Sequence, residues 1–237
     1  MADNTQTEPY DLNIGAGQTF IPGFVNVDIH ERAEVTLDLG KDRLPFPDDS
    51  VRTVFSVATL EHIPDYLFAL GEIHRVLKHG GELLLNLPYV TLTEHHLVNP
   101  YHLHNFSERS FDFFDPRKLK GSAAEDNDIA FRRVYAEFRY LSYMGLMPRP
   151  VRTWARRHLF NVVRDFDIAL VAIKDGGRAT KVNEARVREL KARMAELKCS
   201  RRPYDTDIQA NGTGPGGSSL RARARERLLP YRERITT

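Results

Sequence analysis

Four histidines lie close together in the segment EHHLVNPYHLHNFSERSFDFF: His95, His96, His102 and His104. Histidine changes its charge near neutral pH, which suits it to proton transfer. Together with Glu94, these side chains also form a set of potential metal ligands. Imidazole suits zinc or iron, whereas Mg²⁺ prefers oxygen ligands. The simplest interpretation of any single histidine is a hydrogen bond to loop backbone, but among four we expect at least one with a chemical role.

A second group of residues points to a bound cofactor. The motif LNIGAGQ (12–18) ends an apolar stretch with glycines, as happens where a backbone passes close to a ligand. Alone it also fits a tight turn. Asp28 ends the next apolar stretch, where nucleotide-binding α/β folds place an acidic residue for ribose hydroxyls. The linking segment QTFIPG is too short for a crossover helix, and a pyrophosphate needs a helix N-terminus. The pattern therefore favours a ligand without phosphate groups.

The elements that must position these residues alternate between strand and helix. A helix is predicted where apolar residues recur at helical spacing (65–77), and Gly80-Gly81 is expected to stop it. Strands are predicted from short apolar runs at 10–14, 24–29, 51–57 and 82–87. Such alternation predicts parallel βαβ units with right-handed crossovers.

The second half of the chain is less regular. The stretch 89–160 is rich in His, Phe, Tyr and Arg, and is expected to form a lid over the carboxyl ends of the strands. Two short apolar runs around a turn at 160–174 are expected to supply the last strands. A charged helix with a narrow apolar face follows at 179–198. The composition of NGTGPGGSS indicates a flexible linker, and a basic helix is possible at 220–229.

Four motifs in this order resemble the class I S-adenosylmethionine-dependent methyltransferases of the methyltransferase-11 group. They are LNIGAGQ, GFVNVDI, DLGKDRLPFPDDSVRTVFSVATLEHI and EIHRVLKHGGELLLNLP, and the resemblance covers about 11–88. It implies a Rossmann-like α/β fold with a mixed seven-stranded sheet, a truncated first helix, a lid insert and a helical C-terminal extension. The chain departs from the family in that truncated helix and in Asn13, which replaces an acidic residue.

The resemblance implies S-adenosylmethionine as the cofactor. The glycine turn would line its methionine end, Asp28 would hold the ribose hydroxyls, and Asp38 would meet the adenine amino group. The implied cofactor-binding residues are Asn13, Gly15, Ala16, Gly17, Gln18, Asp28, Ile29, Asp38, Leu39, Ala58 and Thr59.

The acceptor side is predicted from the histidine-rich segment. Similar methyltransferases carry D-P-x-H-x-x-x-(F/W)-(S/T) here, and NPYHLHNFS makes His102 the matching histidine, with Asn99 in place of Asp. The expected catalytic residues are His102, His104 and, from the LEHI signature, His62 and Glu61. Flat aromatic faces suit sugar rings. The expected acceptor-binding residues are Tyr89, His95, His96, Tyr101, Phe106, Tyr143 and Trp154, and Arg149, Arg152, Arg156 and Arg157 are further candidates.

Composition narrows the setting. The net charge of +2 calls for neither nucleic acid nor a membrane partner. A single cysteine, Cys199, excludes a disulfide framework within the chain. The first residues do not resemble a signal peptide, and no apolar run approaches the ~20 residues of a transmembrane helix. We expect a cytoplasmic protein without stable membrane insertion. The basic tail is expected to be solvated, with contact to an anionic membrane surface or a second subunit of a homodimer as alternatives.

These observations predict an enzyme in four parts: a methyltransferase domain (1–177), a charged helix (178–198), a linker (199–219) and a basic tail (220–237). The expected reaction is O-methylation of a hydroxyl on a sugar or glycan, with a histidine base and no required metal, although Mg²⁺ is an option. The alternatives are methylation of a nitrogen or carboxylate of another small molecule, and a non-catalytic cofactor-binding protein of the same fold.

Overall fold

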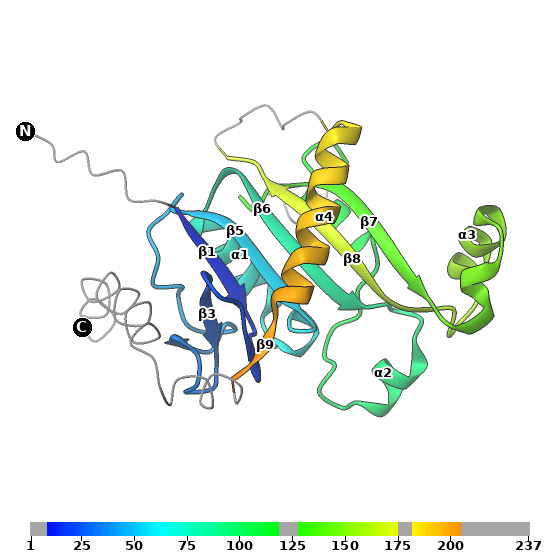
Figure 1. The fold of residues 1–237 in the computed structure, drawn as a ribbon, viewed down its shortest axis with the longest axis horizontal. Coiled ribbons are helices and arrows are strands. Elements are labelled where there is room, and N and C mark those ends of the chain that lie inside the picture. Colours follow the sequence, from blue (N-terminus) through cyan, green and yellow to red (C-terminus); the bar gives the residue numbers. More distant parts are fainter. Residues whose placement is uncertain (1–8, 119–127, 175–181, 205–237) are drawn as a thin grey trace, which may run out of the picture.

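The computed structural model describes residues 9–118, 128–174 and 182–204 (Figure 1). The predicted basic tail at 220–237 lies outside the described residues, as does the linker beyond Tyr204. Within the described ranges, no helix combines the length and apolar character needed to cross a membrane.

A seven-stranded mixed sheet forms the centre of the molecule. Its strands, in spatial order, are β4 (Val35–Thr36), β3 (Val25–Asp28), β1 (Tyr10–Ile14), β5 (Val51–Val57), β6 (Leu77–Pro88), β8 (Val163–Ala172) and β7 (Phe131–Tyr140). Neighbouring strands from β4 to β6 are parallel, and β8 runs antiparallel to both β6 and β7. The mixed seven-stranded sheet predicted from the sequence is confirmed.

The connection from β1 to β3 has no helix. In its place lies β2 (Thr19–Phe20), which pairs antiparallel with β9 (Arg202–Pro203) near the other end of the described chain. The predicted truncation of the first helix is thus confirmed. The remaining elements are η1 (Leu60–His62), α1 (Tyr66–Val76), α2 (Thr93–Val98), η2 (Ser110–Phe114), η3 (Ser142–Leu146), α3 (Arg149–His158) and α4 (Glu184–Ser200).

The predicted role of Gly80 and Gly81 as a helix stop is wrong. Helix α1 ends at Val76, and Leu77 is already extended and begins β6. The β5–β6 register shifts between Val51 and Thr53, and Gly80 has a φ of +76°. The two glycines therefore accommodate an irregularity in the first part of β6, because left-handed backbone at such a site favours glycine.

The last two strands also differ from the prediction. The stretch expected to hold two short strands around a turn is one long strand, β8, which begins at Val163. Its outer partner β7 lies inside the stretch 89–160 that was predicted to be a lid. That stretch consequently contributes an outer strand to the sheet in addition to helices and loops outside it.

Helices cover the two faces of the sheet unequally. One face packs on α1 through Leu70, Ile73 and Val76, and on the aromatic residues of η2. The other face packs on α4, whose apolar stripe consists of Leu190, Met194 and Leu197 (Figure 1). Helix α4 thus covers the second face of the sheet. The connection from β1 to β3 contributes no helix to that cover.

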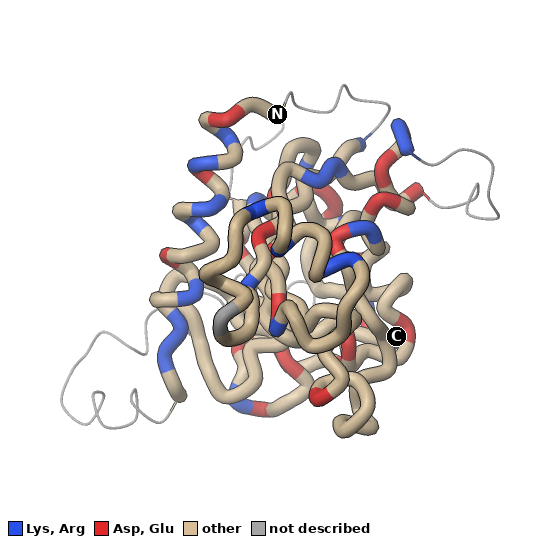
Figure 2. The backbone as a smooth tube through the Cα atoms, turned by 90° about the vertical axis from the view of Figure 1, so that its right-hand side faces the viewer, with Lys and Arg blue, Asp and Glu red and all other residues tan. Residues whose placement is uncertain are grey.

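The charges of α4 also bind the sheet. Arg186 pairs with the buried carboxylate of Glu82 at 2.6 Å, and the Nη2 atom of Arg193 donates to Thr53 Oγ1 at 2.7 Å. Basic and acidic positions follow one another along this helix (Figure 2). The narrow apolar stripe therefore suffices to hold α4 on the sheet, because charged residues beside it have partners on β5 and β6.

Candidate cofactor and acceptor site

The carboxyl ends of four parallel strands bring the predicted cofactor residues to one edge of the sheet. The glycine turn follows β1, Asp28 ends β3, Asp38 follows β4, and Ala58 follows β5. Because these strands are direct neighbours, the four segments lie side by side. In open α/β sheets, ligands bind beyond this edge. We call the four segments, with the glycine turn, Asp28, Asp38 and Ala58, the cofactor edge.

The glycine turn approaches Thr59 so closely that only glycine fits at position 15. Gly15 has a φ of +65°, and a Cβ there would lie 2.1 Å from Thr59 Oγ1. Gly17 also has a positive φ, of +60°, but a Cβ there would meet nothing within 4 Å. The turn is thus closed against β5 on one side and leaves open space beside Gly17, as a cofactor cradle requires.

Asp28 holds this turn in shape. Its Oδ2 atom accepts a hydrogen bond from the Gly17 amide at 2.7 Å, and its Oδ1 atom accepts one from His30 at 3.0 Å. The residue is 6% exposed. An ionised carboxylate can accept about four hydrogen bonds, so capacity remains for the hydroxyls of a ribose. Ile29, the next residue, is exposed beside it.

Asp38 lies in a turn that it caps itself. Its Oδ1 atom accepts from the Gly40 amide at 2.9 Å, and Lys41 Nζ lies 2.9 Å from Oδ2. The hydrogen bond from Lys41, followed by that from Gly40, lowers the pKa of Asp38 below its usual value. Leu39 is buried in the main core. Asp38 therefore stays ionised and can accept a hydrogen bond from an amino group.

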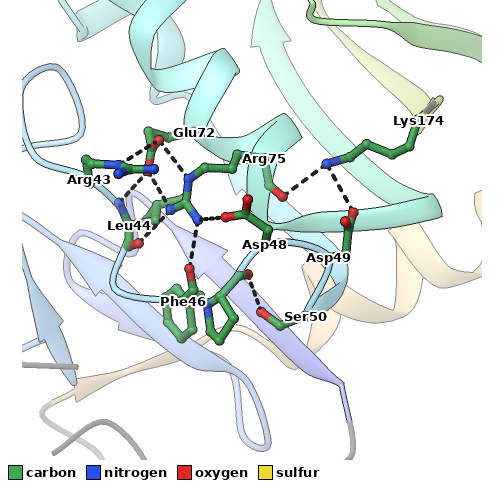
Figure 3. A network of polar contacts seen from close by, with 10 residues as sticks. Arg43, Leu44, Phe46, Asp48, Asp49, Ser50, Glu72, Arg75 and Lys174 are labelled. Carbon is green, nitrogen blue, oxygen red and sulfur yellow. Dashed lines mark hydrogen bonds and ion pairs between the residues drawn. The ribbon is translucent and has the colours of Figure 1, made fainter. Parts of the chain in front are cut away.

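A buried ion-pair network holds the loop between Asp38 and β5 (Figure 3). Arg75 pairs with Glu72 at 2.7 Å and donates to the carbonyls of Leu44 and Phe46 at 2.9 and 3.0 Å. Glu72 in turn accepts from the Leu44 amide at 2.9 Å. Although burial opposes its charge, the hydrogen bond and charge of Arg75 hold the pKa of Glu72 below its ordinary value. The motif EIHRVL thus serves the cofactor edge indirectly, through this loop.

Asn13 has a partner within the protein. It is 1% exposed, and its Nδ2 atom donates to Asn26 Oδ1 at 2.8 Å. The same Asn26 oxygen accepts from the Ile21 amide at 2.9 Å. Asn13 therefore supports the segment after the glycine turn. Asn26 was not singled out from the sequence, although it stands in the quoted motif GFVNVDI.

The end of β5 is strained where it meets the turn. Ala58 has a φ of +51°, a conformation that side chains other than glycine rarely adopt, and its amide donates to the Asn86 carbonyl at 2.9 Å. Ala58 is exposed, as is Gln18 across the turn, whereas Ala16 is fully buried. Strained residues of this kind often lie at ligand sites.

The residues predicted to form the acceptor side begin only two residues beyond Thr59. Glu61 and His62 belong to η1, and His102 comes from the segment after α2. One side-chain donor atom from each of the three lies within 4.8 Å of the others. The amides of Leu103 and His104 donate to the Glu61 carbonyl at 2.8 and 3.2 Å, which fastens the segment to η1. We call these three residues the Glu61–His62–His102 cluster.

Glu61 is the most unusual residue of the cluster. It is 0% exposed, and neither carboxylate oxygen has a hydrogen-bond partner among the described residues. Burial raises the pKa of Glu61 to about 7. Burial also lowers the pKa of His102, to about 4, with smaller contributions from neighbouring imidazoles. The imidazole of His102 is therefore neutral at pH 7, and its Nδ1 atom has no partner among the described residues.

The other histidines of the segment have partners that limit their roles. His104 Nε2 lies 2.9 Å from the carbonyl oxygen of Ile63 and 3.1 Å from that of Pro64, so this nitrogen carries a proton. His96 Nε2 lies 3.0 Å from the Tyr89 carbonyl in the same way. The rings of His95 and His96 lie 5.8 and 5.6 Å from that of His102. Of the two histidines predicted to act as a base, His102 is the one with a nitrogen that is buried without a partner among the described residues.

The predicted aromatic acceptor residues do not form one surface. Tyr89 and Phe106 are buried in the main core, whereas Tyr101 is 75% exposed and directly precedes His102. Trp154 is exposed on α3, where it stacks on His158. The side chain of Tyr143 lies outside the described residues.

Arg156 is the most buried of the arginines predicted near Trp154, and its side chain faces inward. Arg156 pairs with Glu108, and its guanidinium lies 4.0 Å from the centre of the Phe138 ring. It is 7% exposed. Arg156 therefore stabilises the packing of α3 on the sheet.

The sheet order is that of a Rossmann-like α/β fold with a mixed seven-stranded sheet, as the resemblance to class I methyltransferases implies. Residues 25–85 match the family model described as a methyltransferase domain. The match spans Asp28, Asp38 and the Glu61–His62 pair. Over these residues the chain is similar to that methyltransferase family.

Solved structures of similar proteins are distant in sequence. The YcgJ protein from Bacillus subtilis is 19% identical, with a TM-score of 0.49 over 71% of this chain and 93% of that one. A SAM-dependent methyltransferase from Archaeoglobus fulgidus is 15% identical, with a TM-score of 0.49 over 69% of this chain and 86% of that one. No curated protein sequence matches the chain.

Proposed function

We propose that this protein transfers a methyl group from S-adenosylmethionine to a hydroxyl oxygen of a sugar or glycan, and that the Glu61–His62–His102 cluster takes up the hydroxyl proton. The observation that carries the proposal is the position of the cluster. It contains a buried carboxylate and an imidazole nitrogen without partners, and it follows directly on Thr59, which touches the glycine turn.

The residues at the cofactor edge fit S-adenosylmethionine. The open space beside Gly17 suits the methionine end, Asp28 retains acceptor capacity for the ribose, and Asp38 offers an ionised carboxylate for the adenine amino group. When bound, the cofactor supplies an electrophilic methyl carbon on a sulfonium sulfur. The residues of the edge hold and orient it, and alignment of this kind can supply most of the rate acceleration of such a displacement.

The acceptor side then needs a group that removes a proton. The neutral imidazole of His102 would take up the proton that the acceptor hydroxyl releases on methylation, while the carbon–sulfur bond of the bound cofactor would break and its sulfur would leave as a neutral thioether. The nearby Glu61 carboxylate favours the imidazolium that forms, because opposite charges attract strongly in a buried site. The exposed ring of Tyr101 beside this pair provides a flat face for a sugar ring.

Calorimetric titration with S-adenosylmethionine and S-adenosylhomocysteine tests the cofactor half of the proposal. We expect micromolar binding by the wild type and loss of binding in Asp28→Ala. Glu31→Ala, which changes an exposed carboxylate three residues away, is the matched control. Absence of binding by folded wild-type protein would overturn the proposal.

Product analysis tests the acceptor half. Mass spectrometry of reactions with free monosaccharides and oligosaccharides should reveal a mass gain of one methyl group, and kcat should fall on the order of 100-fold in His102→Gln. Turnover that survives in His102→Gln would favour a nitrogen or carboxylate acceptor, which needs no base.

A further inference from the structure

The Glu61 carboxylate needs a positive partner. An ionised carboxylate in a buried position is unfavourable unless it is paired, and among the described residues no lysine or arginine forms a salt bridge with Glu61. Asp28 and Asp38 at the cofactor edge, by contrast, both accept hydrogen bonds from donors within the protein. A proton or a cation must therefore accompany the charge of Glu61.

The two histidines of the cluster present nitrogens suited to a cation. His62 Nδ1 lies 3.0 Å from the Tyr101 carbonyl, and since a carbonyl only accepts, this nitrogen is protonated and Nε2 carries the lone pair. Such a hydrogen bond from the opposite ring nitrogen is the usual support of a metal-ligating histidine. The ring of His102 lies 4.6 Å from that of His62, and its Nδ1 atom is buried without a partner in the described chain.

From this arrangement we infer that Glu61, His62 and His102 form a binding site for a divalent transition-metal ion, with zinc as the best match. Two neutral imidazoles and one carboxylate are a frequent zinc and iron ligand set. Mg²⁺, which the sequence left open, is a poor match because it prefers oxygen ligands. The separations within 4.8 Å require only a small approach of the side chains around an ion.

The fixed backbone around the cluster favours such a site. The hydrogen bonds from Leu103 and His104 to the Glu61 carbonyl hold the two contributing segments together. His62 is exposed, so the ion would keep coordination positions open to solvent. If the proposed function holds, an acceptor hydroxyl could occupy one of them. In the metal-loaded protein the ion would lower the pKa of this hydroxyl and the proton would leave to water, so the role of His102 as a base applies to the metal-free protein.

Metal titration of untagged, chelator-treated protein tests the site without cofactor or acceptor. We expect one Zn²⁺ per chain by calorimetry and a visible absorption band with Co²⁺. The Glu61→Gln and His102→Gln variants should weaken zinc binding on the order of 100-fold. His158→Gln removes an exposed histidine on α3 and should bind as the wild type does. Circular dichroism confirms that each variant is folded.

The site is overturned if folded wild-type protein binds no zinc, or if all three variants bind it equally. Its failure is separate from failure of the proposed function. Zinc binding that depends on Glu61 and His102, in a protein that does not bind S-adenosylmethionine, would sustain the metal site and overturn the methyltransferase proposal. Cofactor binding without zinc binding would do the reverse.

Discussion

The cofactor edge and the acceptor side differ in how their polar groups are satisfied. At the cofactor edge, Asp28 and Asp38 each accept hydrogen bonds from nearby backbone amides. On the acceptor side, the carboxylate of Glu61 and one nitrogen each of His96 and His102 are buried without partners in the described chain. The first region is held in shape by hydrogen bonds within the protein, whereas the second contains buried polar atoms that only a ligand or ion can pair.

The glycine turn offers the strongest test of a preformed cofactor edge. Gly15→Ala would place a methyl group against Thr59 in addition to straining a positive φ, so we expect S-adenosylmethionine affinity to fall on the order of 100-fold or more. Calorimetry measures this loss. Gly23→Ala carries the same type of strain, at a φ of +82°, without a clash. Similar affinities for the two variants would contradict a preformed turn.

Unsatisfied Glu61 should give the metal-free protein an unusual pH dependence. Burial raises the pKa of Glu61 from its ordinary value of 4.5 to about 7, so its contribution to stability is complete at low pH and is lost as pH rises through 7. Between about pH 5 and pH 8, we expect the wild type to lose about 2 kcal/mol of unfolding free energy relative to Glu61→Gln. Urea denaturation at several pH values measures the difference.

Glu72→Gln is the contrasting control, because the Glu72 carboxylate has an ion-pair partner in Arg75. Arg75 lowers the pKa of Glu72, so its contribution to stability is present above about pH 4.5 and is lost only as pH falls below that value. This variant should therefore be less stable than the wild type by a nearly constant amount from about pH 5 to pH 8. A pH-independent difference for Glu61→Gln as well would remove the distinction between the two regions.

The smallest effect is expected at the exposed rim of the acceptor side. Tyr101→Ala should raise the KM for a sugar acceptor a few-fold, because stacking on one aromatic ring contributes only about 1 kcal/mol, and it should leave stability unchanged. Phe160→Ala removes another exposed aromatic ring and is the control for a general surface effect. Equal KM values for Tyr101→Ala and the wild type would argue against a sugar at this position.

The sequence predicted the cofactor half of the fold well because its signals are local. Strands β1 and β5 were predicted with their observed bounds, and apolar runs ending at glycine or aspartate located the edge. Strand β7 was missed because its charged residues suggest a surface. Arg132 pairs with Asp115, and Arg139 pairs with Asp167. Partners so distant in the chain leave no local signal.

The same limit applied to the histidines. Residue type alone marked the four in the segment from His95 to His104, and the match to a family motif favoured His102. That His104 is bound to the Ile63 carbonyl, 41 residues away in the chain, follows only from the fold. The burial of Glu61 without a partner is equally a tertiary property, since LEHI alone does not show which side of η1 faces inward.

The pairing of β9 with β2 has a consequence for the order in which the cofactor edge matures during synthesis. The Tyr204 amide donates to the Gln18 carbonyl at 3.1 Å, and Arg201 donates to Thr19 Oγ1 at 3.0 Å. Residues directly after the glycine turn thus receive their last partners from a segment translated more than 180 residues later. A chain emerging from the ribosome can pair its early strands first. Asp28 can hold the turn itself early, whereas the residues that follow it are secured only when the strand after α4 arrives.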